Sequence, residues 1–397
     1  MTASLYIHVP FCSSLCDYCD FYSVPIHTDH DSDFMDSYII AVLNDVKEQL
    51  DRFNVTYVPT VYIGGGTPSM LGAARIRRLL DGLQALLKPM EKPFYEFTVE
   101  ANPESADEDF LKACVYGGVN RLSLGVQTFH EASRHAVHRA ADVKLLDERL
   151  ALAAGYFPNS LSIDLITGLP LQTADIILND IERILAYKPV HISLYSLCLE
   201  PETVLGKQVR NYGAAALSLP HEDESDNLWI RGRDRLETAG YTQYEVSNFA
   251  LHSEHPQPNQ CAHNIRYWRM ENWLGAGPAA SGTIINNETG SGRRYTYQPD
   301  ISAYLTGQQP CTEELDRAAL IRESLLMGYR YQEGPDLLLF KQRFACEVKN
   351  IIPRTIKRWR NRGFFAGEKV SRQGILFLNS FLRDAFTELD SASDNYR

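Results

Sequence analysis

The feature that most constrains the fold of this 397-residue chain is a repeated alternation of short apolar runs with longer amphipathic runs. Each apolar run has the length of a strand, and each amphipathic run has the length of a helix. Six strand–helix units of this kind predict a parallel sheet with helices packed outside it. The predicted strands are residues 5–9, 60–63, 94–100, 121–125, 162–165 and 191–195, and the predicted helices are 33–53, 71–87, 105–116, a stretch ending near 154, and 174–186.

Polar and glycine-rich residues stand where the predicted strands end. In barrels built from strand–helix units, functional groups lie at the C-terminal ends of the strands. We therefore expect one rim of the barrel to carry Cys12, glycines 64–66, Glu100, Gln127, Asp164 and Ser196.

Three cysteines, Cys12, Cys16 and Cys19, follow the first predicted strand at positions i, i+4 and i+7. The spacing alone also fits one face of a helix with buried thiols, a zinc site completed from elsewhere, or a disulfide pair. Pro10 and the apolar run before it favour a strand that leads into a loop. Thiolates bind iron–sulfur clusters, and three thiolates on a four-iron cluster would leave one iron open for a small molecule.

The sequence around these cysteines is Tyr-Ile-His-Val-Pro-Phe-Cys followed by Cys-Asp-Tyr-Cys-Asp-Phe. It resembles the radical S-adenosylmethionine (SAM) superfamily, and within it the branch of the oxygen-independent coproporphyrinogen oxidases and the HemW-type haem chaperones. The resemblance implies an α/β fold, with an incomplete six-unit (βα)6 barrel followed by a smaller, mostly helical domain. It also implies a [4Fe-4S] cluster on the three cysteines, with SAM bound at the open iron.

The same resemblance implies a set of SAM-binding residues. Glycines let a backbone approach a ligand closely, although Gly-Gly-Gly taken alone is as well explained by a plain turn. In the phrase Gly-Gly-Gly-Thr-Pro after a strand, it matches the methionine-binding segment of the family. The implied residues are Tyr6, Gly65, Gly66, Thr67, Glu100, Gln127, Arg139 and Asp164, with Arg139 suited to pair with a carboxylate.

A second segment, His263-Asn264-Ile-Arg-Tyr267-Trp268, is the most informative part of the second half. From the residues alone, His263 is expected to be a structural hydrogen-bonding residue. The resemblance to the haem chaperones implies instead that His263, Asn264, Tyr267 and Trp268 bind haem, with His263 the preferred iron ligand. Ala280 stands where that family commonly has a histidine.

The pattern predicts a barrel domain over residues 1–210, a connecting region over 211–310, a winged-helix-like helical domain over 311–386 and a tail over 387–397. The helical domain is expected to contain a short apolar strand at 374–378.

The charge and composition indicate which binding partners and which cellular compartment to expect. The formal net charge is −11, which argues against nucleic acid as a partner. Residues 341–372 are locally basic and predict either a solvated helical face or a docking patch for an acidic partner. We find no apolar run long enough to span a membrane and no secretory signal, and the free cysteines and oxygen-sensitive cluster suit the cytoplasm.

Two features separate the two activities of the branch. The oxidases typically carry a further cysteine two positions after the third cluster ligand, where this chain has Phe21, and they carry a longer segment before the cluster. We therefore expect a chaperone that binds haem and delivers it to a haem-requiring protein. The alternatives are an oxygen-independent coproporphyrinogen III oxidase and a scaffold that keeps its cluster for stability. No catalytic residue is assigned.

Overall fold

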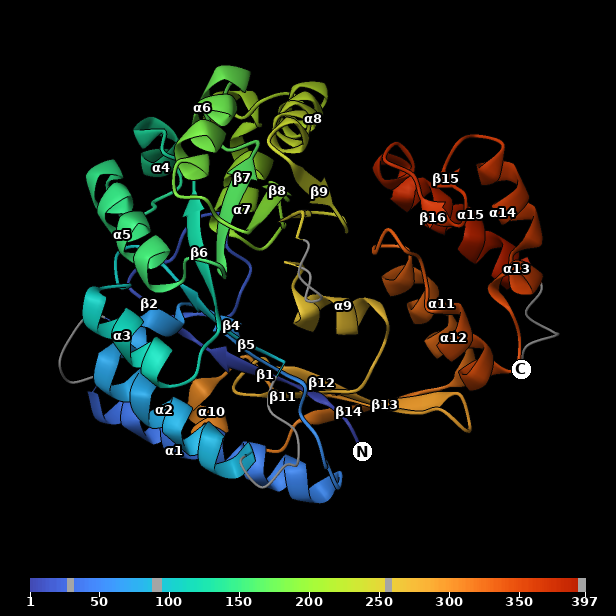
Figure 1. The fold of residues 1–397 in the computed structure, drawn as a ribbon, viewed down its shortest axis with the longest axis horizontal. Helices are drawn as coiled ribbons and strands as arrows, with labels where there is room; N and C mark the ends of the chain where they lie inside the picture. The colour runs from blue at the N-terminus through green and yellow to red at the C-terminus, as the bar shows by residue number, and fades with distance from the viewer. Residues whose placement is uncertain (27–31, 88–94, 254–258, 392–397) are drawn as a thin grey trace.

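The computed structural model describes residues 1–26, 32–87, 95–253 and 259–391. Its centre is a twelve-stranded sheet in the order β14-β13-β12-β11-β1-β4-β5-β6-β7-β8-β10-β9 (Figure 1). The six strands in the middle of this order are parallel neighbours in chain order. They are β1 (Ser4–Val9), β4 (Thr60–Gly65), β5 (Glu96–Ala101), β6 (Arg121–Gln127), β7 (Leu161–Thr167) and β8 (His191–Ser196).

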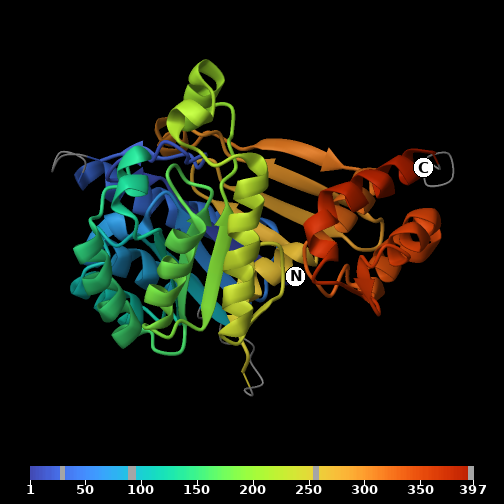
Figure 2. The same ribbon diagram turned by 90° about the horizontal axis from the view of Figure 1, so that it is seen from above.

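Helices follow these strands and pack outside the curved sheet, as Figures 1 and 2 show. They are α1 (Ser32–Arg52), α2 (Gly72–Leu87) after the 3-10 turn η2 (Pro68–Leu71), α3 (Glu108–Tyr116), α4 (Glu131–Ala136), α5 (Val143–Tyr156), α6 (Ala174–Leu185) and α8 (Glu222–Thr238). Between β8 and α8, helix α7 (Val204–Tyr212) with η3 (Ala215–Leu217) contacts the cysteine loop through Leu205. The predicted incomplete barrel of six strand–helix units is confirmed. The predicted third strand began at residue 94, which lies outside the described residues.

Two helix boundaries differ from those predicted. Helix α3 begins at Glu108 and not at 105, because the side chain of Asp107 caps it by accepting a hydrogen bond from the Phe110 amide. The single helical stretch predicted up to residue 154 is two helices. Asp142 caps the second of them, so the segment between α4 and α5 is free to bring Arg139 to the sheet.

Alternation along the strands gives the sheet an apolar and a polar face. Leu5, Ile7 and Val9 of β1 are fully buried in the main hydrophobic core. The residues between them, Tyr6 and His8, carry polar groups to the other face. The same alternation places Thr60 and Tyr62 of β4 and Glu96, Thr98 and Glu100 of β5 inside the barrel. The barrel interior is therefore polar along its whole length.

Residues after the barrel extend the sheet at both edges. Strands β9 (Tyr241–Gln243) and β10 (Asn248–Leu251) are antiparallel neighbours beyond β8. Strand β11 (Trp273–Ala276) pairs parallel with β1 and continues through antiparallel β12 (Ser281–Asn286), β13 (Ser291–Thr296) and β14 (Cys311–Leu315). Helices α9 (Ala262–Trp268) and α10 (Ile301–Leu305) lie in the same segment.

The C-terminal lobe has its own hydrophobic core and lies beside the barrel (Figures 1 and 2). It contains α11 (Arg317–Gly328), α12 (Leu337–Phe344), α13 (Val348–Ile351), α14 (Pro353–Arg360), the hairpin β15 (Phe365–Ala366) and β16 (Lys369–Val370), η4 (Gly374–Phe377) and α15 (Leu378–Ser391). Residues 387–391, which we assigned to a tail, continue α15. The rest of that predicted tail lies outside the described residues.

The predicted strand at 374–378 is wrong. These residues form the 3-10 turn η4, which leads into α15. The hydroxyl of Ser371 accepts the Gly374 amide, and a Cβ at Gly374 would collide with the Phe364 carbonyl. Ile375 and Leu378, three residues apart, both enter the core of the lobe. A short apolar run does not distinguish a strand from a helical turn, which explains the error.

The basic segment 341–372 is extensively paired with acids. Ion pairs join Arg358 to Asp384, Lys369 to Glu333, and Arg372 to both Asp234 and Glu237 on α8. The last of these links the lobe to the barrel. This pairing fits a solvated surface better than a free positive patch.

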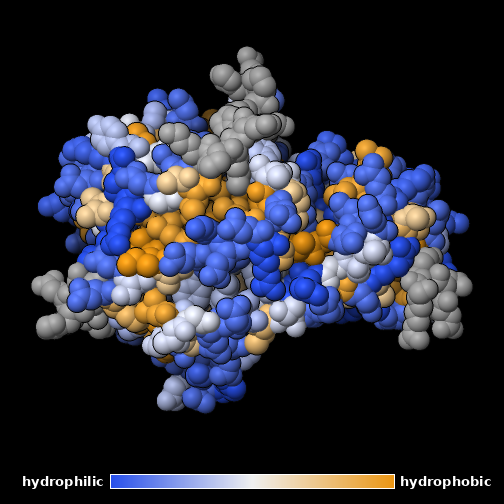
Figure 3. Space-filling view, turned by 90° about the horizontal axis from the view of Figure 1, so that it is seen from below, coloured by the Kyte–Doolittle hydropathy of each residue, from blue (hydrophilic) through white to orange (hydrophobic). Residues whose placement is uncertain are grey.

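The space-filling view in Figure 3 shows a face with hydrophobic side chains gathered near its middle and hydrophilic ones around them. Among the described residues, no helix is both long and apolar enough to cross a membrane.

Candidate functional site

The cysteines lie on a loop at the C-terminal end of β1. After Pro10 the chain forms β2 (Phe11–Cys12), which pairs with β3 (Val24–Pro25), so the segment between them closes into a loop. Cys16 and Cys19 lie in this loop, outside any helix, as the proline predicted. All three are free thiols of intermediate exposure.

Asp17 anchors this loop to the rest of the rim. Its amide donates to the Val137 carbonyl at 3.2 Å, and its carbonyl accepts the Leu205 amide at 2.8 Å. The Asp17 carboxylate, which is nearly fully buried, lies 2.9 Å from His138 Nδ1. Segments before α5 and in α7 thus hold the cysteine loop in place.

A chain of side-chain contacts links two of the cysteines through residues that follow β4 and β5 and a residue between α4 and α5. Cys12 Sγ lies 3.3 Å from Thr67 Oγ1, which accepts a hydrogen bond from Asn102 Nδ2 at 2.9 Å. Asn102 Oδ1 in turn accepts from Arg139 Nη2 at 2.7 Å, and Arg139 Nη1 donates to Cys16 Sγ at 3.6 Å. The Cys12 thiol can donate to Thr67 Oγ1, and a Cys12 thiolate would accept the Thr67 hydroxyl hydrogen instead. Both sulfurs therefore have a hydrogen-bonding group within reach.

Burial disfavours the charged thiolate form of two of the cysteines. Burial raises the pKa of Cys12, and it raises the pKa of Cys19 to about 11, so both stay protonated at neutral pH. The charge of Arg139 acts in the opposite direction on both. A metal centre displaces such protons when thiolates bind it. Among the residues that the structure describes, no three His, Cys, Asp or Glu side chains converge on a single metal ion. In a four-iron cluster each cysteine binds a different iron, so such convergence is not required.

The glycine run packs tightly against the cysteine loop. A Cβ on Gly65, whose φ is +107°, would come within 2.5 Å of His8 Nδ1, and one on Gly66 would lie 2.9 Å from the carbonyls of Val9 and Phe11. The Gly66 and Thr67 amides donate to those same two carbonyls. The run therefore needs glycine so that β4 can support the loop, in addition to any role toward a ligand.

Gln127 and Arg139 meet beside the backbone of Gly125. Arg139 Nη2 donates to the Gly125 carbonyl at 2.6 Å, and a Cβ at Gly125 would lie 3.0 Å from Gln127 Nε2. Gln127 has a φ of +71° next to a register shift between β6 and β7, a conformation rarely adopted without functional cause. Gln127 Oε1 and Arg139 Nε are buried without a partner among the described residues. Unsatisfied groups of this kind are what a polar ligand such as SAM would satisfy.

Glu100 lies below the cysteine loop and inside the barrel. It accepts hydrogen bonds from Tyr62 at 2.6 Å and from the Gly65 amide at 3.2 Å. Burial, with a smaller contribution from nearby Asp164, raises the pKa of Glu100 to about 7 in spite of these bonds. Burial also raises the pKa of Asp164, whose carboxylate accepts from Ser123. Tyr6 shares this interior and bonds His8 Nδ1 at 3.0 Å.

The structure thus brings the three cysteines, Gly65, Gly66, Thr67, Gln127 and Arg139 to one rim, with Glu100, Asp164 and Tyr6 in the interior below it. Sequence reasoning missed Asn102, His8 and Asp17. Asn102 lies two residues after Glu100, in Val99-Glu100-Ala101-Asn102-Pro103. Two residues bring a strand back to the same face, which is the signal that could have identified it.

The His263 segment lies at the other end of the barrel. Glu96, the first residue of β5, accepts hydrogen bonds from the amides of Ala262 and His263 at 2.8 and 3.0 Å and so fixes the start of α9. Thr60, the first residue of β4, bonds His263 Nδ1 at 2.9 Å. The length of β4, about 16 Å at roughly 3.3 Å per residue, separates this end from the glycine run. The structure does not bring the two sets of predicted residues together.

His263 is not available to bind iron in this arrangement. It is 1% exposed, and its second nitrogen, Nε2, lies 3.0 Å from the Tyr267 hydroxyl. Burial, with a smaller contribution from Arg266, lowers the pKa of His263 to about 3, so the ring is neutral. The structural role that the residues alone suggested for His263 fits these contacts, and a free iron ligand does not.

The other residues of this segment also face protein. The Trp268 ring packs with Tyr244 and Tyr331, and its buried Nε1 has no partner among the described residues. Asn264 is half-buried beside it on α9. Ala280, at the position where a histidine is common, is 1% exposed, so a larger side chain there would displace its neighbours.

Comparison with known proteins agrees with the rim just described. Residues 6–184 match the model of the radical SAM superfamily. The chain is 36% identical to the haem chaperone HemW of Lactococcus lactis over 88% of this chain and 86% of that protein. It belongs to the HemW family of radical SAM proteins. The HemW of Bacillus subtilis is 31% identical over 95% of this chain and 97% of its own length.

The fold also matches a solved structure over nearly its whole length. Coproporphyrinogen III oxidase (HemN) from Escherichia coli, a radical SAM enzyme, superposes with a TM-score of 0.77 over 97% of this chain and 90% of its own. At 22% identity this likeness establishes the fold, the α/β partial barrel with its helical C-terminal region, and not the activity.

The link through Thr67 gives a first prediction. Thr67→Val keeps the side-chain shape but removes both hydrogen bonds of the hydroxyl, worth about 1 kcal/mol each. We expect anaerobically reconstituted protein to lose iron and sulfide several-fold faster than the parent on dilution, measured colorimetrically. Thr98→Val is the matched control, because the buried Thr98 hydroxyl has no partner among the described residues. Equal cluster loss from Thr67→Val and the parent would contradict the role of this link.

The buried imidazole of His263 gives a second prediction. The pKa of His263 is about 3 in the folded protein, below its ordinary value of 6.5. Between these two pH values the unfolded chain binds a proton at His263 and the folded chain does not. The stability that neutral His263 provides is therefore complete above about pH 6.5 and is lost as the pH falls towards 3.

We expect His263→Gln to remove up to about 1.4 kcal/mol per pH unit from the acid slope of unfolding free energy. Urea denaturation between pH 4 and 8 measures this slope. An unchanged slope in the variant would show that His263 does not resist protonation in the fold.

Proposed function

We propose that this protein is a haem chaperone, which binds haem and delivers it to a haem-requiring protein, and that it carries a [4Fe-4S] cluster and SAM. The observation that carries the proposal is identity of 30% or more, over most of the chain, to proteins named haem chaperone HemW. The three thiols on one supported loop agree with the cluster. The identity of the haem recipient is not part of the proposal.

Cys12, Cys16 and Cys19 would hold the cluster, and an iron without a thiolate would accept SAM. Such a centre supplies one-electron reduction of SAM when both are bound. The chain's own contribution is to position the ligands. Thr67 and Arg139 would donate to two of the sulfurs in their thiolate form, which favours thiolate over thiol.

For SAM, the residues present offer complementary groups. Gln127 Oε1 and Arg139 Nε are buried polar atoms that lack partners among the described residues. Glu100, with its pKa near 7, is a carboxyl that a hydroxyl or ammonium group of a ligand would draw into its charged form. The Gly65 and Gly66 amides already donate within the protein, so this segment would act on SAM through its carbonyls.

For haem, the rim of the cysteine loop supports binding better than His263. Leu15 and Phe21, on this loop beside the cysteines, are 50% and 66% exposed and so offer apolar surface next to the proposed cluster. A flat apolar ligand would cover them. Ligation by His263 would require α9 to release its contacts to Thr60 and Tyr267.

The second candidate function is the oxygen-independent coproporphyrinogen III oxidase. It is favoured by the fold shared with the Escherichia coli oxidase. Phe21 opposes it, because the oxidase pattern expects a cysteine at that position. A reducing compartment such as the cytoplasm would suit either function, since all eight cysteines are free thiols.

A haem titration with matched variants tests the proposal. The reconstituted parent should shift the Soret band of haem saturably with one equivalent bound. Phe21→Ser should weaken binding at least tenfold by removing apolar contact, and His263→Gln should bind as the parent does. If His263→Gln lost haem binding while Phe21→Ser bound haem as the parent does, the haem site would lie at α9 and not at the cysteine loop. No saturable binding by the parent would contradict the chaperone.

The same preparation distinguishes the second candidate. Incubated anaerobically with SAM, a reductant and coproporphyrinogen III, it should release no carbon dioxide beyond the Cys16→Ser control, which lacks a cluster ligand. Stoichiometric or greater release of carbon dioxide, with formation of protoporphyrinogen, would make the protein an oxidase.

A further inference from the structure

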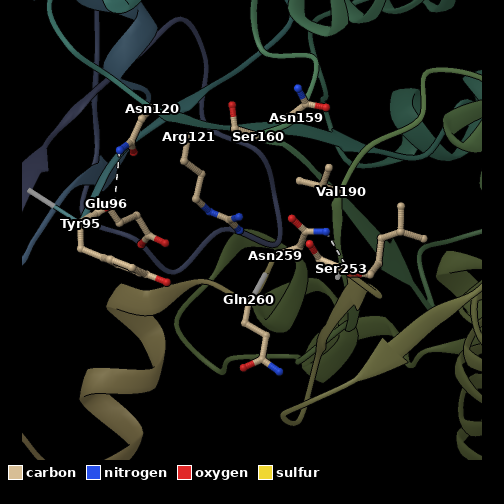
Figure 4. Close-up of a pocket in the computed structure, with 11 residues that line it drawn as sticks. Tyr95, Glu96, Asn120, Arg121, Asn159, Ser160, Val190, Ser253, Asn259 and Gln260 are labelled. Atoms are coloured by element: carbon tan, nitrogen blue, oxygen red, sulfur yellow. Dashed lines mark hydrogen bonds between the residues drawn. The ribbon is translucent and has the colours of Figure 1, made fainter. Parts of the chain in front are cut away.

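A cavity of ≈ 550 Å³ opens at the end of the barrel opposite the cysteines. Its wall comes from the starts of the parallel strands, at Glu96 of β5, Arg121 of β6 and Ser160 just before β7. Leu251, which ends the antiparallel β10, closes the side. Figure 4 shows the lining side chains around this space. The volume lies within the range of small-molecule sites, about 300–1,000 Å³.

Arg121 is the unusual group in this cavity. It is 7% exposed, and its Nε is buried without a hydrogen-bond partner. Among the described residues, its guanidinium forms no hydrogen bond and no ion pair within 4.0 Å. Arginine stays protonated, so a full positive charge lies here, largely removed from water. Figure 4 shows its side chain extending into the space that the lining residues surround.

Glu96, the carboxylate in the lining, is already engaged elsewhere. Its two oxygens accept from the amides of Ala262 and His263 and from Cys261 Sγ, at 2.8, 3.0 and 3.4 Å. The negative charge of Glu96 therefore stabilises the N-terminus of α9, where the helix dipole is positive. Glu96 forms no ion pair with Arg121 within 4.0 Å, although its charge is close enough to help keep the guanidinium protonated. The guanidinium is therefore left without a direct hydrogen-bonded acid among the described residues.

Residues at the N-terminal ends of barrel strands usually stabilise the fold, which is the alternative explanation for Arg121. Stabilising buried arginines are paired, because an unpaired buried charge is costly. Arg134 in the same barrel shows the contrast, since it donates to the carbonyls of Val126, Thr128 and Ala141. Arg121 has no such bonds among the described residues, and only longer-range attraction, including that of Glu96, offsets the burial of its charge. A direct acidic partner would complete its environment.

Neutral donors accompany the charge. The side chain of Asn159 makes no hydrogen bond with the described residues, and the Gln260 amide is engaged only through its oxygen, with the Tyr331 hydroxyl at 3.4 Å. Ser160 adds a hydroxyl to the lining. The planar guanidinium that Arg121 extends into this space is the side-chain group best suited to recognise a carboxylate.

We propose that this cavity binds a small organic carboxylate through Arg121, at a site separate from the cysteine rim. The carboxylate completes the pairing that Glu96 does not provide, and the amide and hydroxyl groups of the lining bind the rest of the ligand. The inference is independent of haem binding.

Isothermal titration of the full chain with succinate, at low ionic strength, tests the proposal. We expect saturable binding at millimolar concentration or tighter, and none for the neutral analogue succinamide. Arg121→Gln should weaken binding at least tenfold. Asn159→Asp adds a negative charge to an exposed position of the wall and should weaken binding several-fold without disturbing the core.

Asn211→Asp on α7 is the control, because it makes the same charge change at an exposed position outside the cavity lining, and it should bind as the parent does. Circular dichroism melting identifies any variant that fails to fold. If Arg121→Gln does not fold, the binding of succinate to Asn159→Asp decides the question. No binding by the parent, equal binding by Asn159→Asp and the parent, or binding of inorganic phosphate but not succinate would each overturn the proposal.

Discussion

The candidate site depends on the hydroxyl of Thr67, which joins the cysteine loop to the sheet. It lies between Cys12 on the loop and Asn102 after β5, and Asn102 continues the contact to Arg139 and Cys16. Four separate chain segments therefore set the positions of two thiols. This is possible because parallel strands deliver their C-terminal ends to the same rim. Loss of strand register would disperse these groups, so the fold and the metal site are linked.

The two ends of the polar barrel interior differ in how well their buried polar groups are hydrogen-bonded. At the cysteine end, Gln127 Oε1 and Arg139 Nε are left without partners among the described residues, in the way expected of a ligand site. At the opposite end, Glu96, Thr60 and Tyr267 satisfy α9 and enclose His263. Arg121 is the exception at that end, since Glu96, the carboxylate in the same lining, is hydrogen-bonded to α9. Buried groups that are satisfied stabilise the fold, whereas Gln127, Arg139 and Arg121 combine an unpartnered polar atom with a position at a proposed ligand site.

Much of the barrel could be predicted from the sequence because its signals are local. Apolar runs gave the six strands, and Pro10 indicated that Cys16 and Cys19 lie in a loop. The short run at 374–378 was predicted wrongly, because its turn is set by a contact between Gly374 and the distant Phe364. The same limit applies to His263. Its motif indicated importance, but only the tertiary structure shows both ring nitrogens bonded to protein.

The central claim is that three thiolates hold a four-iron cluster with one iron open to SAM. Mössbauer spectroscopy of the ⁵⁷Fe-reconstituted protein, with and without SAM, tests it most directly. The account predicts a [4Fe-4S] spectrum in which a quarter of the iron signal shifts when SAM is added. A spectrum that SAM leaves unchanged, or protein that takes up zinc and forms no cluster, would contradict it.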